Sequence, residues 1–449
     1  MFDVDDAGVP FESEWPALLA NYDRPIPRYT SYPPVPAWSG GRPEARARIE
    51  GEARSAGTAA MYVHVPFCPS LCYYCACNRC ITKDQVLVDR YLDAVEGELE
   101  QVARRARGLR LAVLHWGGGT PNSLQPSQMS RLFEAIASRF QIDDSAEISI
   151  EIDPRLASQA QIAHLGRLGF NRLSAGVQDF NAQTQAAIHR TQSIAQTAAA
   201  IGWARDARIG NINIDLIYGL PHQRRATFAQ TVSEVQRLAP ETVAMYAYAH
   251  VPWVNHAQRS YEESLPSQLE KFGMLVDATR SFAAAGYEQI GIDHFAARNS
   301  DLARAARSGS LQRSFMGYTR VRAETLVGIG ASAISSSFDA FAQNRSDVVE
   351  YIASARTGDL TARGCLLGDE DRVRRRIISD IMTSGVVRAD ERILADLAID
   401  GFDGVIADGL AVLDMNGLRL TKLGRLFARN VAVCFDAYAQ GQRRQASAV

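Results

Sequence analysis

The chain has 449 residues, of which 47% are hydrophobic, and its formal net charge at pH 7 is −2. This length exceeds the roughly 250 to 300 residues at which a single core stops growing, so we expect a main domain with smaller additions. The balanced charge excludes the overall basic field that nucleic acid or anionic lipid would need. The apolar runs are far shorter than the ~18 residues of a membrane span, and the acidic first residues differ from a signal peptide, so we expect a cytoplasmic protein without a membrane partner.

Short apolar runs alternate with amphipathic stretches between residue 61 and about residue 250. Such alternation is typical of βα units that build a parallel sheet or barrel. Strands are predicted at 61–67, 109–116, 146–153, 171–178, 211–218 and 242–249. A helix is predicted over about 85–105, where apolar residues recur at the spacing of one helix face. We therefore predict an α/β fold, a partial (β/α)6 TIM-like barrel.

The chain divides into three predicted parts. Residues 1–58 should form an N-terminal arm, because the prolines and polar aromatic residues of 27–36 are typical of irregular structure. The barrel and its extension are expected over 59–340. From 341 to 449 the pattern is mainly helical, with a hairpin over 410–420 that turns at Asn416–Gly417 and a helix capped by Thr421. This last part resembles a winged helix.

Four arginines in that last part, Arg372, Arg374, Arg375 and Arg376, could indicate contact with nucleic acid. The overall charge argues against that interpretation, so we expect a solvated helix face and no nucleic-acid partner.

The most informative pattern is a cluster of cysteines. Cys68, Cys72 and Cys75 follow the spacing C-x3-C-x2-C, which supplies three thiolates to a [4Fe-4S] cluster and leaves one iron open. S-adenosylmethionine (SAM) can chelate such an iron, and its reductive cleavage yields a 5′-deoxyadenosyl radical. A structural zinc site normally needs four ligands, and the next candidates, Cys365 and Cys434, are distant. The spacing therefore predicts a radical SAM enzyme.

Further candidates lie after the predicted strands. The glycines of HWGGGTP (115–121) let the backbone approach a ligand closely, which suits the methionyl end of SAM. Glu151, Gln178 and Asp215 stand near the ends of three successive strands, at the rim where barrel enzymes bind ligands. Together with Arg190 they offer partners for the polar atoms of SAM, with Asp215 suited to its ribose hydroxyls. Each one alone could equally be a satisfied lumen residue.

Ordered segments along nearly the whole chain carry a resemblance to a known family. They include PRYTSYP (27–33), YVHVPFC (62–68), CYYCACN (72–78), HWGGGTP (115–121), EISIEIDP (147–154), NIDLIYGLP (213–221) and VCFD (433–436). In these segments the sequence resembles the oxygen-independent coproporphyrinogen III oxidase family. The resemblance implies heme biosynthesis without oxygen, in which two propionates of coproporphyrinogen III become vinyl groups to give protoporphyrinogen IX. It also implies an electron donor such as flavodoxin or ferredoxin, an unidentified electron acceptor and a monomer.

The resemblance also assigns roles to individual residues. The SAM contacts of the family fall on Tyr62, Tyr74, Gly118, Gly119, Thr120, Glu151, Gln178, Arg190, Asp215 and Ala249. Cys77 matches a fourth family cysteine that activity requires although it does not ligate the cluster. The similar heme chaperones usually carry phenylalanine at this position, so Cys77 favours an oxidase.

Two positions depart from the family pattern. Met316 replaces a glutamine that contacts a second SAM molecule, whereas Ile334, the other contact, is retained. Methionine cannot donate a hydrogen bond as an amide can, so the second SAM could bind more weakly, or the enzyme could act on a different tetrapyrrole side chain. Cys80 stands where an aliphatic residue is usual, and we interpret it as a half-buried bystander rather than an auxiliary ligand.

The four propionates of the family's substrate require cationic and hydroxyl partners, and Arg28, Tyr29, Thr30 and Tyr32 of the arm are candidates. Packing of the arm on the barrel is the alternative role for these residues. Two alternatives to the oxidase remain open: a heme-binding chaperone of the same family, and a radical SAM enzyme that acts on heme or another tetrapyrrole.

Overall fold

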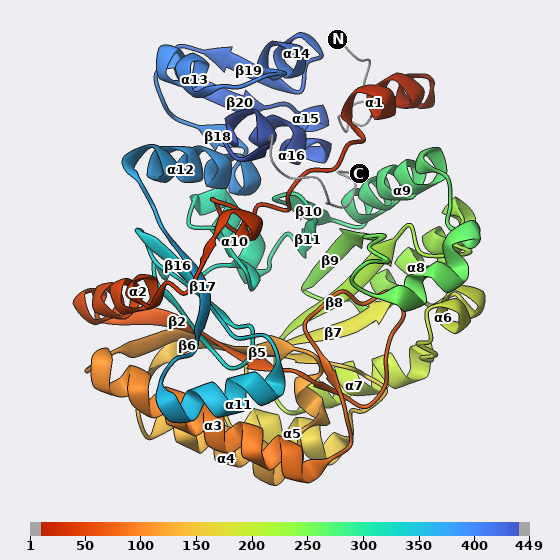
Figure 1. The fold of residues 1–449 in the computed structure, drawn as a ribbon. Coiled ribbons are helices and arrows are strands. Elements are labelled where there is room, and N and C mark those ends of the chain that lie inside the picture. The colour runs from red at the N-terminus through yellow and green to blue at the C-terminus, as the bar shows by residue number, and fades with distance from the viewer. Residues whose placement is uncertain (1–9, 440–449) are drawn as a thin grey trace.

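A computed structural model describes residues 10–439 of the chain. Its core is a parallel sheet whose strands follow the chain order (Figure 1). The strands are β2 (Thr58–Val65), β5 (Arg110–Gly118), β6 (Gln141–Ile152), β7 (Arg172–Gln178), β8 (Asn211–Tyr218) and β9 (Thr242–Ala247). These strands confirm the predicted βα core, which forms a partial barrel.

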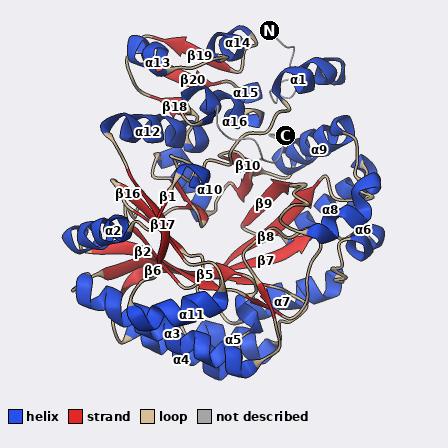
Figure 2. Cartoon of the chain, in the orientation of Figure 1, coloured by secondary structure: helices blue, strands red, loops and turns tan. Residues whose placement is uncertain are grey.

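Helices cover the outer face of this sheet (Figure 2). They are α3 (Gln85–Arg105), α4 (Pro126–Ala137), α5 (Gln159–Arg167), α6 (Ala182–Ala187), α7 (Ile194–Asp206) and α8 (Arg225–Leu238). The bounds of α3 match the prediction, since the Asp84 side chain accepts hydrogen bonds from the amides of Val86 and Leu87 and so caps the helix. Its buried stripe includes Leu92 and Leu99, as the apolar spacing predicted.

The sheet extends beyond the parallel strands at both edges. On one side β14 (Leu326–Ile329) pairs in parallel with β2, followed by the antiparallel strands β15 (Ile334–Ser336), β16 (Ala340–Asn344), β17 (Thr361–Leu366) and β1 (Ser39–Gly40). On the other side β9 pairs with β11 (His294–Ala297), which pairs with β10 (Tyr287–Ile290). The helices α9 (Gln268–Ala284), α10 (Asp301–Ser308) and α11 (Val348–Thr357) join these strands.

The strand pairing bears on the predicted division of the chain. Because β16 and β17 complete the main sheet, that sheet continues past residue 340 to Leu366. The arm also contributes to it through β1, although the arm was expected to lie outside the sheet. The division at residues 58 and 340 remains a proposal, and the pairing favours a later second boundary, after β17. Residues 1–9, on which part of the cytoplasmic prediction rested, lie outside the described residues.

The arm has two helices, α1 (Trp15–Tyr22) and α2 (Pro43–Ala56), on either side of an irregular segment. This segment contains residues 27–36, as the prolines predicted. Helix α1 lies against the C-terminal part of the chain, where the Tyr22 hydroxyl donates to the Asp408 carboxylate at 2.6 Å. The arm therefore bridges the barrel and the C-terminal helices.

The C-terminal part places helices beside a small sheet (Figure 1). It contains α12 (Asp369–Thr383), β18 (Val386–Val387), α13 (Glu391–Leu397), α14 (Phe402–Ala407), β19 (Ala411–Asp414), β20 (Gly417–Leu420), α15 (Lys422–Leu426) and α16 (Ala428–Ala432). The hairpin turns at Met415–Asn416, one residue earlier than predicted, because Asp414 pairs with Gly417. Thr421 accepts from the Gly424 amide and caps α15 as predicted.

Two of the four arginines of α12 do not lie on the solvated face that we expected. Arg374 is buried and donates to the carbonyls of Leu397 and Phe435. Arg375 donates to the Ser337 carbonyl at 2.6 Å, and its guanidinium carbon lies 4.4 Å from the ring centroid of Phe341. These two side chains bind internal carbonyls, a use that overall charge could not indicate.

Among the described residues, no helix combines the length and the apolar character that crossing a membrane needs.

A buried carboxylate joins several elements near the start of the sheet. Glu98 of α3 is fully buried and lies 2.8 Å from the Arg46 guanidinium of α2. It also accepts hydrogen bonds from the Tyr351 hydroxyl at 2.6 Å, the Gly330 amide at 2.8 Å and the Asn344 amide at 2.8 Å. Loss of one member of such a network leaves buried polar groups without a partner, which is costly.

The substitution Glu98→Ala should therefore lower the free energy of unfolding by about 3 to 5 kcal/mol, because Arg46 would keep a buried charge with less compensation. The matched control is Glu100→Ala on the same helix, which removes only ion pairs with Arg104 and Arg139 at the surface. Its effect should stay within about 0.5 kcal/mol. Chemical denaturation of both variants measures the difference, and equal losses would contradict this view of Glu98.

Candidate active site

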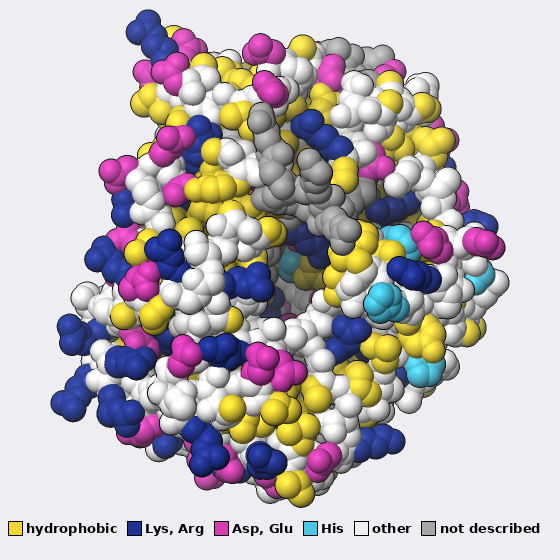
Figure 3. Space-filling view, viewed as in Figure 1, with side chains coloured by type: hydrophobic (Ala, Val, Ile, Leu, Met, Phe, Trp, Pro, Cys, Tyr) yellow, Lys and Arg dark blue, Asp and Glu magenta, His cyan; other side chains and the backbone are white. Residues whose placement is uncertain are grey.

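A cavity of about 350 Å³ lies inside the partial barrel, toward the carboxyl ends of the parallel strands. Figure 3 shows the surface hollowed near the middle of one face, with Lys and Arg side chains around the opening. Most of the site residues that the sequence predicted line this cavity. Those that line it are Tyr74, Cys75, Cys77, Gly118, Gly119, Thr120, Glu151, Gln178, Arg190 and Asp215.

Some predicted SAM contacts lie outside this lining. Tyr62 stacks on His115 with ring centroids 5.8 Å apart and so stands behind a lining residue. Ala249 lines a neighbouring outer cavity. Ile334 packs on β15 among apolar side chains that include Trp38, so the structure does not bring it to the inner cavity.

The cysteine loop connects two short paired strands, β3 (Phe67–Cys68) and β4 (Cys80–Ile81), directly after β2. Its backbone is held from outside the loop. The buried Asn255 amide donates to the carbonyls of Tyr73 at 2.8 Å and Cys75 at 3.0 Å. The buried Gln258 amide donates to the Tyr74 carbonyl at 3.0 Å. A segment about 180 residues downstream thus fixes the shape of this loop.

The thiol groups have distinct surroundings. Cys68 Sγ lies 3.2 Å from the Thr120 hydroxyl, and burial raises the pKa of this thiol to about 11. Cys72 Sγ accepts a hydrogen bond from Arg190 at 3.5 Å. The Cys77 thiol beside Cys75 lowers the pKa of Cys75 to about 6. A buried thiol such as Cys68 ionises when it coordinates a metal, so the donor set suits metal thiolate chemistry.

Two glycines bring the end of β5 against the start of the cysteine loop. The Gly119 amide donates to the Val65 carbonyl at 2.9 Å, and a Cβ at Gly119 would stand 2.4 Å from the Pro66 carbonyl oxygen. Gly118 has a φ of +116°, and a Cβ there would meet the His64 ring at 2.5 Å. Only glycine permits this approach. The approach of the glycine run to a ligand, which the sequence predicted, stays a prediction.

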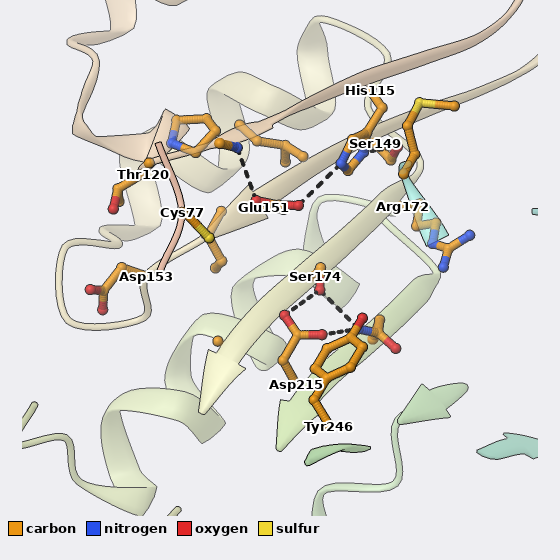
Figure 4. Close-up of a pocket in the computed structure, with 18 of the residues that line it drawn as sticks. Cys77, His115, Thr120, Ser149, Glu151, Asp153, Arg172, Ser174, Asp215 and Tyr246 are labelled. Carbon is orange, nitrogen blue, oxygen red and sulfur yellow. Dashed lines mark hydrogen bonds and ion pairs between the residues drawn. The ribbon is translucent and has the colours of Figure 1, made fainter. Parts of the chain in front are cut away.

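Glu151 presents an ionised carboxylate to the cavity (Figure 4). Burial alone would raise its pKa, but hydrogen bonds from His115 Nε2 at 3.3 Å and the Gly118 amide at 3.2 Å lower the pKa below its ordinary value. His115 is itself held by the Ser149 hydroxyl at 2.7 Å. The carboxylate is thus oriented and charged, ready to accept hydrogen bonds from a cationic or amide group.

Asp215 lies on the next part of the cavity wall (Figure 4). Its oxygens accept from the Ser174 hydroxyl at 3.0 Å and the Asn213 amide at 2.8 Å. Burial, with the charge of Glu151, raises the pKa of Asp215 to about 6. A carboxylate in this state can accept hydrogen bonds from neutral hydroxyl groups, such as those of a ribose.

The guanidinium of Arg190 links the cysteine loop to the sheet. Besides its bond to Cys72, it donates to the Gly176 carbonyl at 2.7 Å and the Asp153 carboxylate at 2.9 Å. Arg155 binds the same carboxylate at 2.7 Å. Asp153 therefore holds two guanidinium groups beside the Cys72 thiol, a role that sequence reasoning did not predict.

Comparisons with known proteins decide the family. Residues 62–235 match the family model described as the radical SAM superfamily. The oxygen-independent coproporphyrinogen III oxidase of Pseudomonas aeruginosa is 40% identical, covering 96% of this chain and 97% of its own. The enzyme of Escherichia coli is 38% identical and covers 95% and 96%. The chain belongs to the oxygen-independent coproporphyrinogen III oxidase family. The solved structure of the Escherichia coli coproporphyrinogen III oxidase, HemN, a radical SAM enzyme, matches with a TM-score of 0.87 and 36% identity over 92% of this chain.

As a radical SAM enzyme the protein takes a [4Fe-4S] cluster and SAM. Among the described residues, no group of three His, Cys, Asp or Glu side chains could hold a single metal ion. The loop cysteines fit a cluster instead, because each thiolate ligates a different iron and the three need not meet at one point. We therefore infer Cys68, Cys72 and Cys75 as the cluster ligands.

Several lining residues escaped prediction. They are His115, Arg172, Asn213 and Tyr246. Ser149, Glu151 and Asp153 alternate with apolar residues over 146–153, and such alternation predicts one polar face toward the lumen. That prediction is confirmed, since Ser149, Glu151 and Asp153 line the cavity. No local sequence pattern could have predicted the contact of Asn255 with the cysteine loop, because only tertiary folding brings the two together.

The role of Asn255 gives a testable prediction. Asn255→Ala should lower the iron content of the anaerobically reconstituted protein at least twofold, because three loop carbonyls lose their donor. The control Ser260→Ala, in the same turn, removes only a hydrogen bond to the Ala257 carbonyl and should load fully. Iron analysis and the visible absorption of the cluster measure the loading. Full loading of the Asn255 variant would show that the loop keeps its shape without this amide.

The raised pKa of Asp215 gives a second prediction. Since the folded state holds this proton more tightly than the unfolded state, ionisation costs stability as pH rises from about 4 to 6. Asp215→Asn removes that cost and should raise the free energy of unfolding by about 1 to 2 kcal/mol at pH 7.5, and by less at pH 5. The same change should weaken SAM binding about tenfold. Denaturation at both pH values and equilibrium dialysis with SAM test this, and a destabilised variant at pH 7.5 would contradict it.

Proposed function

We propose that the protein is a SAM-dependent coproporphyrinogen III dehydrogenase that acts in heme biosynthesis without oxygen. It converts two propionate side chains of coproporphyrinogen III to vinyl groups and so gives protoporphyrinogen IX. In each conversion –CH2–CH2–COO⁻ becomes –CH=CH2 and CO2, with loss of one hydrogen atom and one electron. The observation that carries the proposal is the 40% identity to named enzymes of this activity over 96% of the chain.

When bound, the reduced cluster and SAM supply a 5′-deoxyadenosyl radical that can take a hydrogen atom from an unactivated C–H bond. The residues of the chain then have three tasks. Glu151, Gln178 and Arg190 would bind polar atoms of SAM, and Asp215 would bind its ribose hydroxyls. Gly118 and Gly119 line the cavity, where they would let the backbone stand close to the ligand. Cys77 lines the same cavity and is proposed as the catalytic cysteine.

The electron donor, the acceptor and the assembly state also belong to this proposal. A donor of the flavodoxin or ferredoxin type would reduce the cluster, and an unidentified acceptor would take the electron that each decarboxylation releases. We propose a monomer in the cytoplasm. The free state of all seven cysteines suits a reducing compartment.

Met316 favours a second candidate function. Its side chain lines the inner cavity and a further cavity beside the arm, so it stands where the two meet. If methionine weakens a second SAM site, the protein could instead act on heme or another tetrapyrrole with a single SAM. The mass of the product separates the two activities.

The decisive test is anaerobic incubation of the reconstituted protein with SAM, a reductant and coproporphyrinogen III, followed by mass spectrometry. We expect two successive losses, each of one CO2 and two hydrogens, because each vinyl group forms by one oxidative decarboxylation. Cys77→Ser should abolish these losses while the cluster absorption stays, since Cys77 is not a proposed ligand. SAM cleavage that leaves coproporphyrinogen III unchanged would refute the proposal and favour the second candidate.

A further inference from the structure

A second cavity, of about 590 Å³, adjoins the first on the side of the arm. It lies between the arm, the segment after β9 and the cysteine loop, and apolar and aromatic side chains such as Ile26, Tyr248 and Trp253 form much of its wall. Tyr74 and Cys77 line both cavities. The outer cavity thus offers a large apolar ring a place next to the proposed reaction site.

Two arginines from distant parts of the chain line this outer cavity. Arg28 belongs to the arm and Arg429 to α16. Arg28 donates to the Ala247 carbonyl at 3.0 Å and lies 5.8 Å from the ring centroid of Tyr246. Arg429 donates to the Ile26 carbonyl at 3.3 Å. Arg28 also lines the inner cavity, so it stands where the two cavities meet.

The charges of several arginines act on one another here. The charges of Arg28 and Arg313 act on Asp293. The charges of Arg28, Arg313 and Asp293 in turn act on Arg429. The charges of Arg28 and Arg429 also act on Lys271, together with that of Asp23. Burial, together with the charge of Arg28, lowers the pKa of Arg429 to about 10. An anion bound here would relieve the repulsion among these cations.

We propose that Arg28 and Arg429 together bind propionate carboxylates of the tetrapyrrole substrate, whose ring lies in the outer cavity. The inference rests on the proposed function and extends it to the groups that orient the substrate. Guanidinium groups match carboxylates in bidentate geometry, and partial burial strengthens such contacts. With the ring in the outer cavity and two of its carboxylates held at Arg28 and Arg429, another propionate can enter the inner cavity beside Cys77.

The C-terminal part of the chain gains a role from this inference. Helix α16 carries Arg429 to the cavity, while the arm passes between α16 and the barrel and contributes Arg28 (Figure 1). The substrate would therefore contact three parts of the chain: the arm, the barrel and the C-terminal helices. Sequence reasoning named Arg28 as a candidate, but nothing in the sequence indicated that residue 429 would stand with it.

The test uses coproporphyrin III, the fluorescent oxidised form of the substrate, titrated into the anaerobically reconstituted protein. Arg28→Gln and Arg429→Gln should each weaken its binding about tenfold or more. Binding of the tetramethyl ester, in which the carboxylates are blocked, should change less than twofold. The matched control is Arg419→Gln, because Arg419 is an exposed arginine of the same C-terminal part. This control should bind as the unaltered protein does.

Two further measurements distinguish a failure of this inference from a failure of the proposed function. The cluster absorption of each variant reports whether the site is intact. Arg28→Lys and Arg429→Lys retain the charge but lose the bidentate geometry, so they should bind more weakly than the unaltered protein and more tightly than the matching glutamine variants. Unchanged affinity for coproporphyrin III in both glutamine variants, beside normal turnover by the unaltered protein, would overturn this inference alone. An unaltered protein that cleaves SAM but neither binds coproporphyrin III nor converts coproporphyrinogen III would overturn the proposed function and this inference with it.

Discussion

The close approach of the glycine run to the chain after β2 is the constraint on which the site depends. Gly119 lies so near the Pro66 carbonyl that no side chain fits between them, and the amides of Gly119 and Thr120 bind the carbonyls of Val65 and Phe67. These contacts fix the start of the cysteine loop to the end of β5. Without them the thiols would not stand beside the strand ends that carry Glu151 and Asp215.

Charge is distributed around the cavity in a way that suits a ligand with both ammonium and carboxylate groups. Glu151 stays ionised through its hydrogen bonds, whereas Arg190 is neutralised by Asp153 and also touches Cys72. In a half-buried site each such contact is stronger than it would be in water. The same principle applies at the outer cavity, where Arg28 and Arg429 stand ready for the carboxylates of a polyanionic substrate.

The local pattern of the sequence was enough to predict the parallel strands, helix α3 and the cysteine motif, because each depends on spacing within a short segment. Pairings between distant segments could not be predicted. β1 joins the sheet beside β17, and Arg375 turns inward onto Phe341, although neither segment carries a local sign of its partner. The positions of Asn255 and Arg429 could not be predicted either, since tertiary folding alone brings these residues to the site.

The measurement that tests the central claim most directly is electron–nuclear double resonance on the reduced protein with SAM labelled at its amino nitrogen and carboxylate oxygen. If Cys68, Cys72 and Cys75 leave one iron open, as the three-thiolate site requires, both labels should couple magnetically to the cluster. A cluster whose spectrum shows no coupling to either label would mean that a fourth protein ligand closes the site, which would contradict a cluster held by these three cysteines alone.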